Sequence, residues 1–149
     1  MGQVFKTQRK VRFGECDVGG VVYYPNYFNW FHETMEVWFE EALGCPYVDV
    51  LKDYGFPTVD TSASYRAPVL MGELVDIHFS IERLGTSSIR FQIVIMGPEQ
   101  KVRTVGMVQV VCISINNGQF KFQSSPLPDV LREKMSPYLG GIAFGDSLK

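Results

Sequence analysis

The chain is poor in the residues that build metal sites and disulfide frameworks. Its 149 residues include three cysteines, Cys16, Cys45 and Cys112, and two histidines, His32 and His78. The cysteines are odd in number and widely spaced, which matches neither a disulfide framework nor a zinc motif. We therefore expect no metal site, and we interpret the cysteines as small buried residues.

Long apolar runs and an excess of basic charge are also missing. No apolar stretch approaches the roughly 18 residues that span a bilayer, and residues 1–6 lack the apolar region of a signal peptide. The formal net charge is −2, whereas nucleic-acid-binding proteins usually carry a basic surface. These features favour a cytoplasmic protein that binds neither membrane nor nucleic acid.

What the chain does contain is an ordinary globular composition. Apolar residues make up 46% and charged residues 20% of the sequence, which is a typical balance. A length of 149 residues suits one domain with one core. We expect a single domain over residues 1–149, in which residues 140–149 form a loose, glycine-containing tail.

Residues 27–43 predict a long helix, because apolar side chains recur on one broad side of it at helical spacing. Polar residues such as Glu33 and Glu36 share the opposite side. Gly44 is a typical stop signal, and Pro46 follows it shortly afterwards. The side expected to be buried carries Tyr27, Phe28, Trp30, Phe31, Met35, Trp38, Phe39 and Ala42.

Alternation with a period of two predicts strands before and after this helix. In the first strand, Phe5, Val11 and Phe13 are expected to share one face. Short turns join the later strands, so their pairing should be antiparallel. This order predicts an α+β fold with one long helix against an antiparallel sheet. The expected strands cover residues 4–13, 58–65, 75–82, 88–95 and 101–115, with a short return at 120–122 and a short helix at 128–135.

The chemically most informative stretch is residues 12–27. Asp17 follows the first strand, the glycines Gly19 and Gly20 come next, and Pro25 is typical of a helix start. A helix N-terminus offers N–H groups without intrahelical partners, and these stabilise a developing oxyanion. A carboxylate beside them can attack a carbonyl directly or act as a general base on water. The glycines leave room for close approach of a substrate.

Plainer interpretations of the same residues stay open at this point. An aspartate followed by two glycines is a common turn, in which the carboxylate of Asp17 accepts hydrogen bonds from nearby backbone. Asn26 is equally consistent with a helix cap and with a substrate contact.

A family resemblance is carried by residues 13–27, FGECDVGGVVYYPNY, and continues to Trp30. This motif resembles the 4-hydroxybenzoyl-CoA thioesterase family of acyl-CoA thioesterases. The order of the predicted elements resembles the hotdog fold of that family, in which a curved antiparallel sheet wraps one long central helix. The resemblance therefore implies a hotdog domain that hydrolyses an acyl-CoA thioester to a free carboxylic acid and coenzyme A.

The resemblance also implies roles for particular residues. Asp17 matches the catalytic aspartate of the family, as nucleophile or general base, and the backbone N–H near Tyr24 matches the group that polarises the thioester carbonyl. Pro25 stands where many relatives have a histidine, and Glu15 stands where they often have an aspartate. The implied substrate is an aromatic, 4-hydroxybenzoyl-like acyl-CoA or a short acyl-CoA. Coenzyme A is part of that substrate, so no separate cofactor is expected.

Two further sets of residues are expected, one from position near the motif and one on the later strands and turns, where the resemblance implies basic residues. The acyl group needs apolar walls, and the phosphates of coenzyme A favour basic partners. Tyr47 and Phe56 are additional candidates for the walls. The expected substrate-binding residues are Gly19, Gly20, Tyr23, Asn26, Tyr27 and Trp30, and those expected at the coenzyme phosphates are Arg83, Arg90 and Arg103.

The resemblance further implies assembly, because a single hotdog unit leaves sheet edges open for pairing. We expect a homo-oligomer, either a dimer with a continuous sheet or a homotetramer built from two dimers. Two alternatives remain for function. One is a thioesterase that takes its acyl group from an acyl carrier protein, and the other is a non-catalytic hotdog module that binds acyl-CoA.

Overall fold

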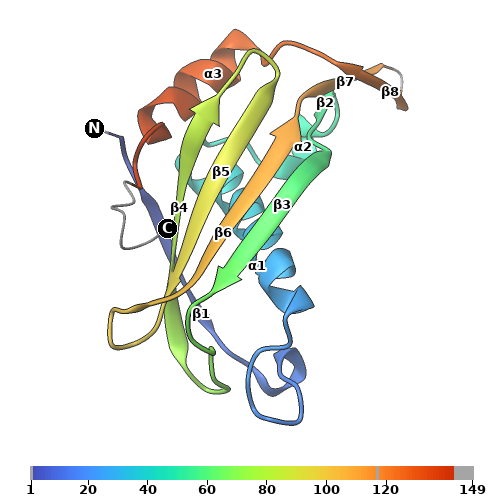
Figure 1. Cartoon of the computed structure of the whole chain (residues 1–149). Coiled ribbons are helices and arrows are strands. Elements are labelled where there is room, and N and C mark those ends of the chain that lie inside the picture. The colour runs from blue at the N-terminus through green and yellow to red at the C-terminus, as the bar shows by residue number, and fades with distance from the viewer. Residues whose placement is uncertain (1, 117, 143–149) are drawn as a thin grey trace.

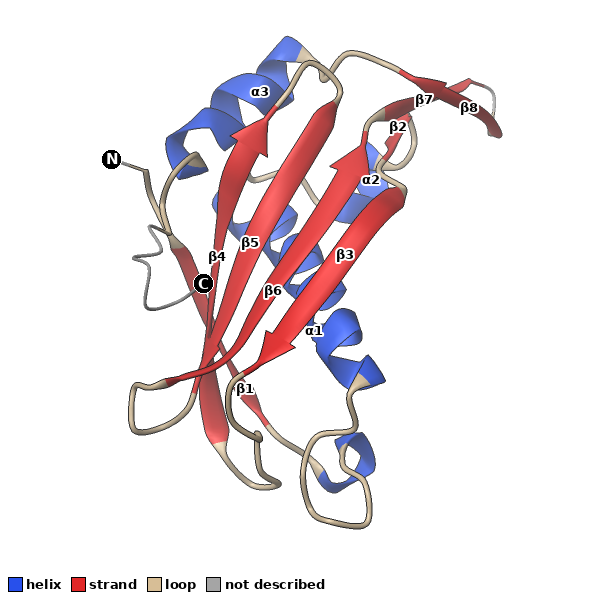
Figure 2. Cartoon of the chain, viewed as in Figure 1, coloured by secondary structure: helices blue, strands red, loops and turns tan. Residues whose placement is uncertain are grey.

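The structure is a computed structural model that describes residues 2–116 and 118–142. Within these residues, one curved antiparallel sheet wraps around a long helix, α1 (Figure 1). Figure 2 shows the same view by secondary structure, with the strands of the sheet lying over α1. This arrangement confirms the predicted α+β hotdog fold.

The described residues form two sheets and three α-helices. The larger sheet has the strand order β1-β4-β5-β6-β3, with antiparallel neighbours. Its strands are β1 (Phe5–Lys10), β3 (Thr58–Tyr65), β4 (Leu74–Leu84), β5 (Ser88–Met96) and β6 (Val102–Val111). The smaller sheet contains β2 (Tyr54–Gly55), β7 (Ile113–Asn116) and β8 (Gln119–Ser124). The helical elements are η1 (Phe13–Glu15), α1 (Pro25–Val37), η2 (Trp38–Ala42), α2 (Tyr47–Val50), α3 (Asp129–Met135) and η3 (Ser136–Tyr138).

The central helix begins two residues earlier than predicted, at Pro25. Proline is well placed in a first helical turn, where its missing N–H leaves no bond unmade. After Val37 the helix continues as the π-helical turn η2, which ends at Ala42, one residue before the predicted end. Gly44 follows with a φ of 67°, a left-handed conformation that favours glycine and stops the helix.

The core lies between the aromatic side of this helix and the inner face of the sheet. The ring of Trp38 lies 5.3 Å from that of Phe79 on β4 and 5.4 Å from that of Phe91 on β5. Burial of each such side chain contributes about 1.5–3 kcal/mol. Phe28 and Ala42 are partly buried, while the rest of the predicted helix face is fully confirmed as core: Tyr27, Trp30, Phe31, Met35, Trp38 and Phe39.

The prediction that Phe13 shares the core face of the first strand is wrong. Strand β1 ends at Lys10, and Phe13 lies in η1 with 82% of its surface exposed. The chain leaves the sheet here because the Arg12 N–H bonds to the Glu15 carboxylate, at 2.9 Å, rather than to a neighbouring strand. The side chain of Phe13 thereby comes to lie on the surface near Asp17.

The predicted strand over residues 101–115 is two strands in two different sheets. Strand β6 ends at Val111 and β7 begins at Ile113. Between them, Cys112 is buried, and its backbone bonds outside the larger sheet, with its N–H donated to Ser87 O at 2.7 Å and its carbonyl accepting Ser125 N–H at 2.8 Å. The alternation of apolar residues continues through this break, so the sequence pattern does not indicate where one strand ends and the next begins.

The described start of the predicted loose tail is bonded to the sheet. Gly140 donates its N–H to Ile81 O at 2.8 Å, and Ile142 donates to Ser80 Oγ at 3.1 Å. Residues 143–149 lie outside the described residues. Among the helices of the described chain, none has the length and apolarity needed to cross a membrane.

We predict that Gly106→Ala destabilises the fold. Gly106 lies on β6 directly opposite the ring of Phe31, and an added methyl group would collide with that ring. The free energy of unfolding should fall by about 1–3 kcal/mol, as in other overpacked cores. Gly14→Ala is the matched control, because a methyl group there meets nothing within 4 Å. Urea unfolding of both variants measures the difference, and equal stabilities would contradict the tight contact.

Candidate active site

Asp17 lies in a tight turn between η1 and α1. Its N–H donates to Val21 O at 2.9 Å, and Gly20 N–H donates back to the carbonyl of Asp17 at 3.0 Å. Gly20 has a φ of 76°, which favours glycine. Gly19 N–H donates to Asp17 Oδ1 at 2.8 Å. The turn interpretation of Asp17 is therefore correct, and it accounts for one of the two carboxylate oxygens.

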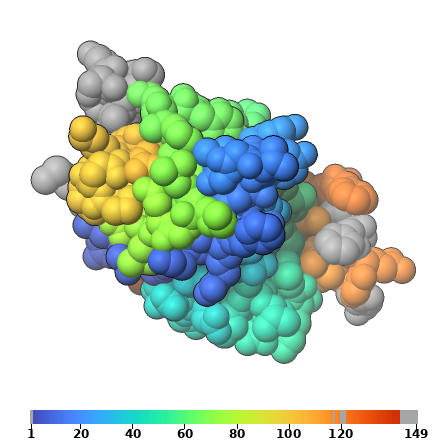
Figure 3. Space-filling model, turned by 90° about the horizontal axis from the view of Figure 1, so that it is seen from below, coloured from blue at the N-terminus to red at the C-terminus, as the bar shows by residue number. Residues whose placement is uncertain are grey.

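The second oxygen of this carboxylate is open to chemistry. Among the described residues, nothing donates a hydrogen bond to Asp17 Oδ2, and the side chain is exposed. It lines a hollow of about 530 Å³ whose other walls are mainly apolar. Figure 3 views this end of the molecule from below, where the blue N-terminal surface meets the green surface of the middle of the chain. The hollow is lined by Phe13, Cys16, Asp17, Val18, Gly20, Tyr23 and Met71.

Cys16 shares this hollow and is the other potential nucleophile in it. Burial, together with the negative charges of Glu15 and Asp17, raises the pKa of its thiol. A thiol that stays protonated at neutral pH is a poor nucleophile. The carboxylate of Asp17 is therefore the better reacting group of the two.

The N-terminus of α1 presents a free backbone donor at Tyr24. Asn26 N–H donates to Tyr23 O at 2.9 Å and Tyr27 N–H to Tyr24 O at 3.2 Å, which closes the first turn. No acceptor within residues 2–116 or 118–142 takes the N–H of Tyr24 itself. This group is thus available to a carbonyl oxygen, in the positive field of a helix start.

Tyr24 opens onto a second hollow, of about 320 Å³, rather than onto the one that contains Asp17. Tyr27 also lines it, but with 4% of its surface exposed. Burial raises the pKa of the Tyr27 phenol, and its ring packs 5.0 Å from that of Tyr65. Within one chain, Asp17 and Tyr24 therefore line two separate hollows.

The side chains of Asn26 and Trp30 bond to Glu15 and do not line the hollow that contains Asp17. Asn26 Nδ2 donates to the carbonyl of Glu15 at 2.9 Å, and Asn26 Oδ1 accepts the side-chain Nδ2 of Asn29 at 3.3 Å. Trp30 is 1% exposed, and its indole N–H donates to Glu15 Oε2 at 2.7 Å. Both side chains therefore contact the motif itself. Glu15, which stands where relatives often have an aspartate, is the residue that they share.

Tyr47 and Phe56 belong to the core rather than to either hollow. Their rings pack 5.2 Å and 5.5 Å from the ring of Phe39. Burial raises the pKa of Tyr47 to about 12. Among the described residues, no cluster of three or more His, Cys, Asp or Glu side chains is arranged to hold a metal ion.

The three arginines expected at the coenzyme phosphates are in unlike surroundings. Arg103 is paired with Glu73 at 2.9 Å and with Glu99 at 2.7 Å, and its side chain is 11% exposed. These contacts do not support a phosphate-binding role for it. Arg83 and Arg90 lie opposite each other on β4 and β5. Arg83 is exposed, and Arg90 has a carboxylate, that of Asp60, 4.0 Å away.

Comparison with known proteins identifies the family of the chain. The sequence profile of the thioesterase-like superfamily matches residues 11–135, from the end of the first strand to the end of α3. The fold and this match define a hotdog-fold thioesterase. The chain belongs to the thioesterase-like superfamily.

Individual relatives agree with this family. A 1,4-dihydroxy-2-naphthoyl-CoA hydrolase from Prochlorococcus marinus (strain NATL2A) is 31% identical over 120 residues, covering 73% of this chain and 74% of the relative. The solved structure of a gentisyl-coenzyme A thioesterase has a TM-score of 0.76 and 27% identity, covering 89% of this chain and 99% of that one. A 1,4-dihydroxy-2-naphthoyl-CoA thioesterase from Synechocystis shares the fold, with a TM-score of 0.78 at 20% identity, over 89% of this chain and 96% of that one.

We predict that Arg103 supports stability above the acid range. Hydrogen bonds from Arg103 lower the pKa of Glu73 below its usual 4.5. A carboxyl group with a depressed pKa in the folded state stabilises above its unfolded pKa, and this contribution is lost as the pH falls through the folded value. Arg103→Gln should therefore cost more stability at neutral pH than well below about pH 4.5.

Urea midpoints measured across this pH range test the prediction. Arg83→Gln removes the same charge from an exposed position and serves as the control. A cost of Arg103→Gln that did not depend on pH would contradict the role assigned to the ion pair.

Proposed function

We propose that this protein hydrolyses aromatic acyl-CoA thioesters to a free carboxylic acid and coenzyme A. The observation that carries the proposal is the free N–H of Tyr24, the residue just before α1, a few residues along the chain from a turn that holds an exposed carboxylate. The names of the relatives, which act on dihydroxynaphthoyl-CoA and gentisyl-CoA, support an aromatic acyl group.

In the proposed reaction, the thioester oxygen accepts a hydrogen bond from the Tyr24 N–H. An oxyanion donor of this kind is typically worth about 2.7–4 kcal/mol in the transition state. In one route, Asp17 Oδ2 attacks the carbonyl carbon and displaces the thiolate of coenzyme A, and water then hydrolyses the resulting mixed anhydride to the free acid and the Asp17 carboxylate. In the other route, Asp17 takes a proton from a water molecule that attacks the carbonyl carbon and displaces the thiolate. The thiolate of coenzyme A is a good leaving group, so the reaction needs no strong general acid.

The walls of the Asp17 hollow suit an aromatic acyl group. Phe13 is 82% exposed, Tyr23 is 51% exposed and Met71 is 48% exposed, and all three line the hollow with the carboxylate. An aromatic ring placed against them would remove apolar surface from water and stack on the tyrosine or phenylalanine. Gly19 and Gly20 keep the approach to the carboxylate open. Contacts of Arg83 and Arg90 with the coenzyme phosphates, and a cytoplasmic location, stay predictions.

The proposed site is completed in a homo-oligomer. Strand β3 lies at the edge of the larger sheet, and most of its residues are exposed. An open edge of this kind favours pairing with the same strand of a second copy. Assembly also offers a reason why the hollows of Asp17 and Tyr24 are separate in one chain. We therefore expect a dimer, or two dimers joined as a tetramer, with sites at the subunit interface.

The function is tested by release of thiol from a panel of aromatic, short and long acyl-CoAs. The wild-type protein should hydrolyse at least one aromatic thioester, and Asp17→Asn should lose a factor of about 100 or more in kcat. Asp49→Asn is the control, because Asp49 is an exposed carboxylate on α2 that pairs with Lys52.

Other results would contradict the proposal. Near-full turnover by Asp17→Asn would remove Asp17 from the mechanism. Binding of acyl-CoA without cleavage would favour a non-catalytic module. Cleavage of acyl groups from an acyl carrier protein alone would change the substrate class.

Assembly is tested by sedimentation velocity over a range of concentrations. The wild-type protein should sediment as a dimer or larger, and Val59→Asp should shift it toward the monomer, because Val59 is 57% exposed on β3 and an edge charge opposes pairing. Val130→Asp on α3 is the control at a similarly exposed valine. A monomeric wild-type protein with full activity would refute the interface.

A further inference from the structure

The backbone of Glu15 holds the two residues that flank the oxyanion donor. Its carbonyl oxygen accepts the N–H of Tyr23 at 2.9 Å and the side-chain Nδ2 of Asn26 at 2.9 Å. Tyr23 immediately precedes Tyr24, and Asn26 lies two residues after Tyr24. The direction of the free Tyr24 N–H is therefore set by two bonds to one oxygen atom.

The same short segment also carries Asp17. Residues 15–17 run antiparallel to residues 21–23, with Cys16 opposite Val22. Tyr23 donates its N–H to the carbonyl oxygen of Glu15, and Asp17 donates its N–H to that of Val21, at 2.9 Å. Asp17 stands at one end of this small ladder, and the start of α1 stands at the other. A shift of Glu15 would therefore displace both reacting groups together.

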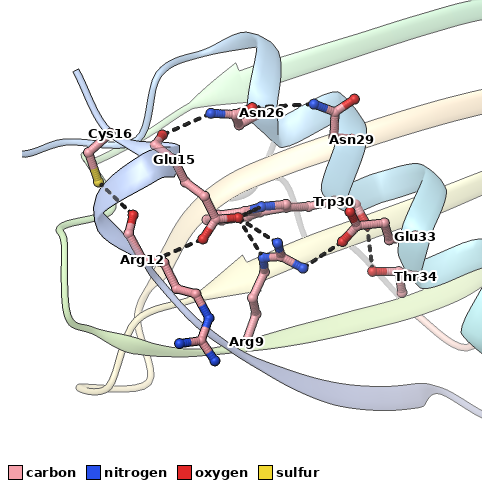
Figure 4. Close-up of polar contacts among 9 residues, drawn as sticks. All are labelled: Arg9, Arg12, Glu15, Cys16, Asn26, Asn29, Trp30, Glu33 and Thr34. Atoms are coloured by element: carbon pink, nitrogen blue, oxygen red, sulfur yellow. Dashed lines mark hydrogen bonds and ion pairs between the residues drawn. The ribbon is translucent and has the colours of Figure 1, made fainter.

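The carboxylate of Glu15 ties this ladder to rigid parts of the fold (Figure 4). Oε1 accepts the backbone N–H of Arg12 at 2.9 Å, and Oε2 accepts the indole N–H of Trp30 at 2.7 Å and Arg9 Nε at 3.0 Å. Trp30 is fixed in the core, and the Arg9 guanidinium lies 5.0 Å from the centre of its ring. Glu15 thus joins β1, the loop and the middle of α1.

The charge of Glu15 is retained by these contacts. Burial acts to raise its pKa, but hydrogen bonds from Arg12, Arg9 and Trp30 outweigh burial and lower the pKa below 4.5. The Glu15 side chain is 16% exposed. Four N–H donors converge on its carboxylate: the Arg12 backbone, the Trp30 indole, Arg9 Nε and a second guanidinium nitrogen of Arg9. A neutral replacement would leave some of these donors without an acceptor.

We infer that Glu15 is a positioning residue for the proposed thioesterase site. It does not face the hollow that contains Asp17, and it acts through the backbone that carries Asp17 and Tyr24. This inference rests on the proposed function, because the two groups that Glu15 positions are those of the proposed reaction.

The test compares Glu15→Gln with Glu33→Gln. Both substitutions remove a carboxylate that is paired with Arg9, but Glu33 lies on the exposed side of α1. Glutamine at position 15 keeps the size of the side chain and places an amide where donors converge. A misplaced reacting group costs up to about 100-fold in rate, so Glu15→Gln should lower kcat by roughly 10- to 100-fold and leave KM within about twofold. Glu33→Gln should leave both constants unchanged.

Two further variants separate positioning from loss of fold. Glu15→Asp keeps the charge and should recover part of the lost kcat. Arg9→Gln leaves the Trp30 and Arg12 donors in place and should lower kcat in the same direction by a smaller factor. An unchanged kcat in either Glu15→Gln or Arg9→Gln, with the protein folded by thermal melting, would overturn the inference.

Amide hydrogen exchange provides a readout that does not depend on activity. Glu15→Gln should speed exchange at the Tyr23 and Asp17 amides by about tenfold or more, because both ladder bonds then open more often. Glu33→Gln should not. A wild-type protein without thioesterase activity would refute the proposed function. Unchanged exchange in Glu15→Gln would refute the positioning role by itself.

Discussion

The packing of one aromatic helix against one curved sheet is the contact on which the rest of this structure depends. Trp38, packed against both Phe79 and Phe91, fixes the far end of the helix, and Trp30 is buried in the core nearer its start. The start of α1 therefore has a defined place relative to β1 and the loop that joins them. The core thereby holds the helix start, with its free N–H, in one place, as the proposed reaction requires.

Much of the fold could be predicted because buried positions recur in the sequence as apolar residues at helix or strand spacing. The helix over residues 25–42 and the strand at 58–65 were found within two residues of their ends. Breaks that preserve the pattern were missed. Cys112 is as apolar as a strand residue should be, and the loss of its sheet bonds depends on Ser87 and Ser125. Phe13 was misplaced because its exposure depends on where Glu15 bonds, which its own side chain does not reveal.

In the candidate site, too, features with a local sequence pattern could be predicted, whereas features set by distant contacts could not. The motif indicated Asp17, the glycines and the helix start, because each has a local role that sequence spacing expresses. It gave Glu15 less weight, since its importance comes from donors on three separate elements, Arg9, Arg12 and Trp30. The prediction of Arg103 at a phosphate came from its place on a later strand, where the resemblance implies basic residues. Its partners Glu73 and Glu99 are 30 and 4 residues away and become visible only in three dimensions.

The bonds of the segment at residues 66–73 restrict how its length can change. Val69 O accepts Val22 N–H at 2.9 Å, Met71 N–H donates to Gly20 O at 3.0 Å, and Pro68 O accepts from Arg103 at 2.6 Å. An insertion or deletion here would disturb the hydrogen bonds that this segment makes to Gly20 and Val22, on either side of Val21 in the Asp17 turn. In relatives that keep this turn, we expect the segment to vary in residue type but to keep its number of residues, whereas other surface turns are free to lengthen.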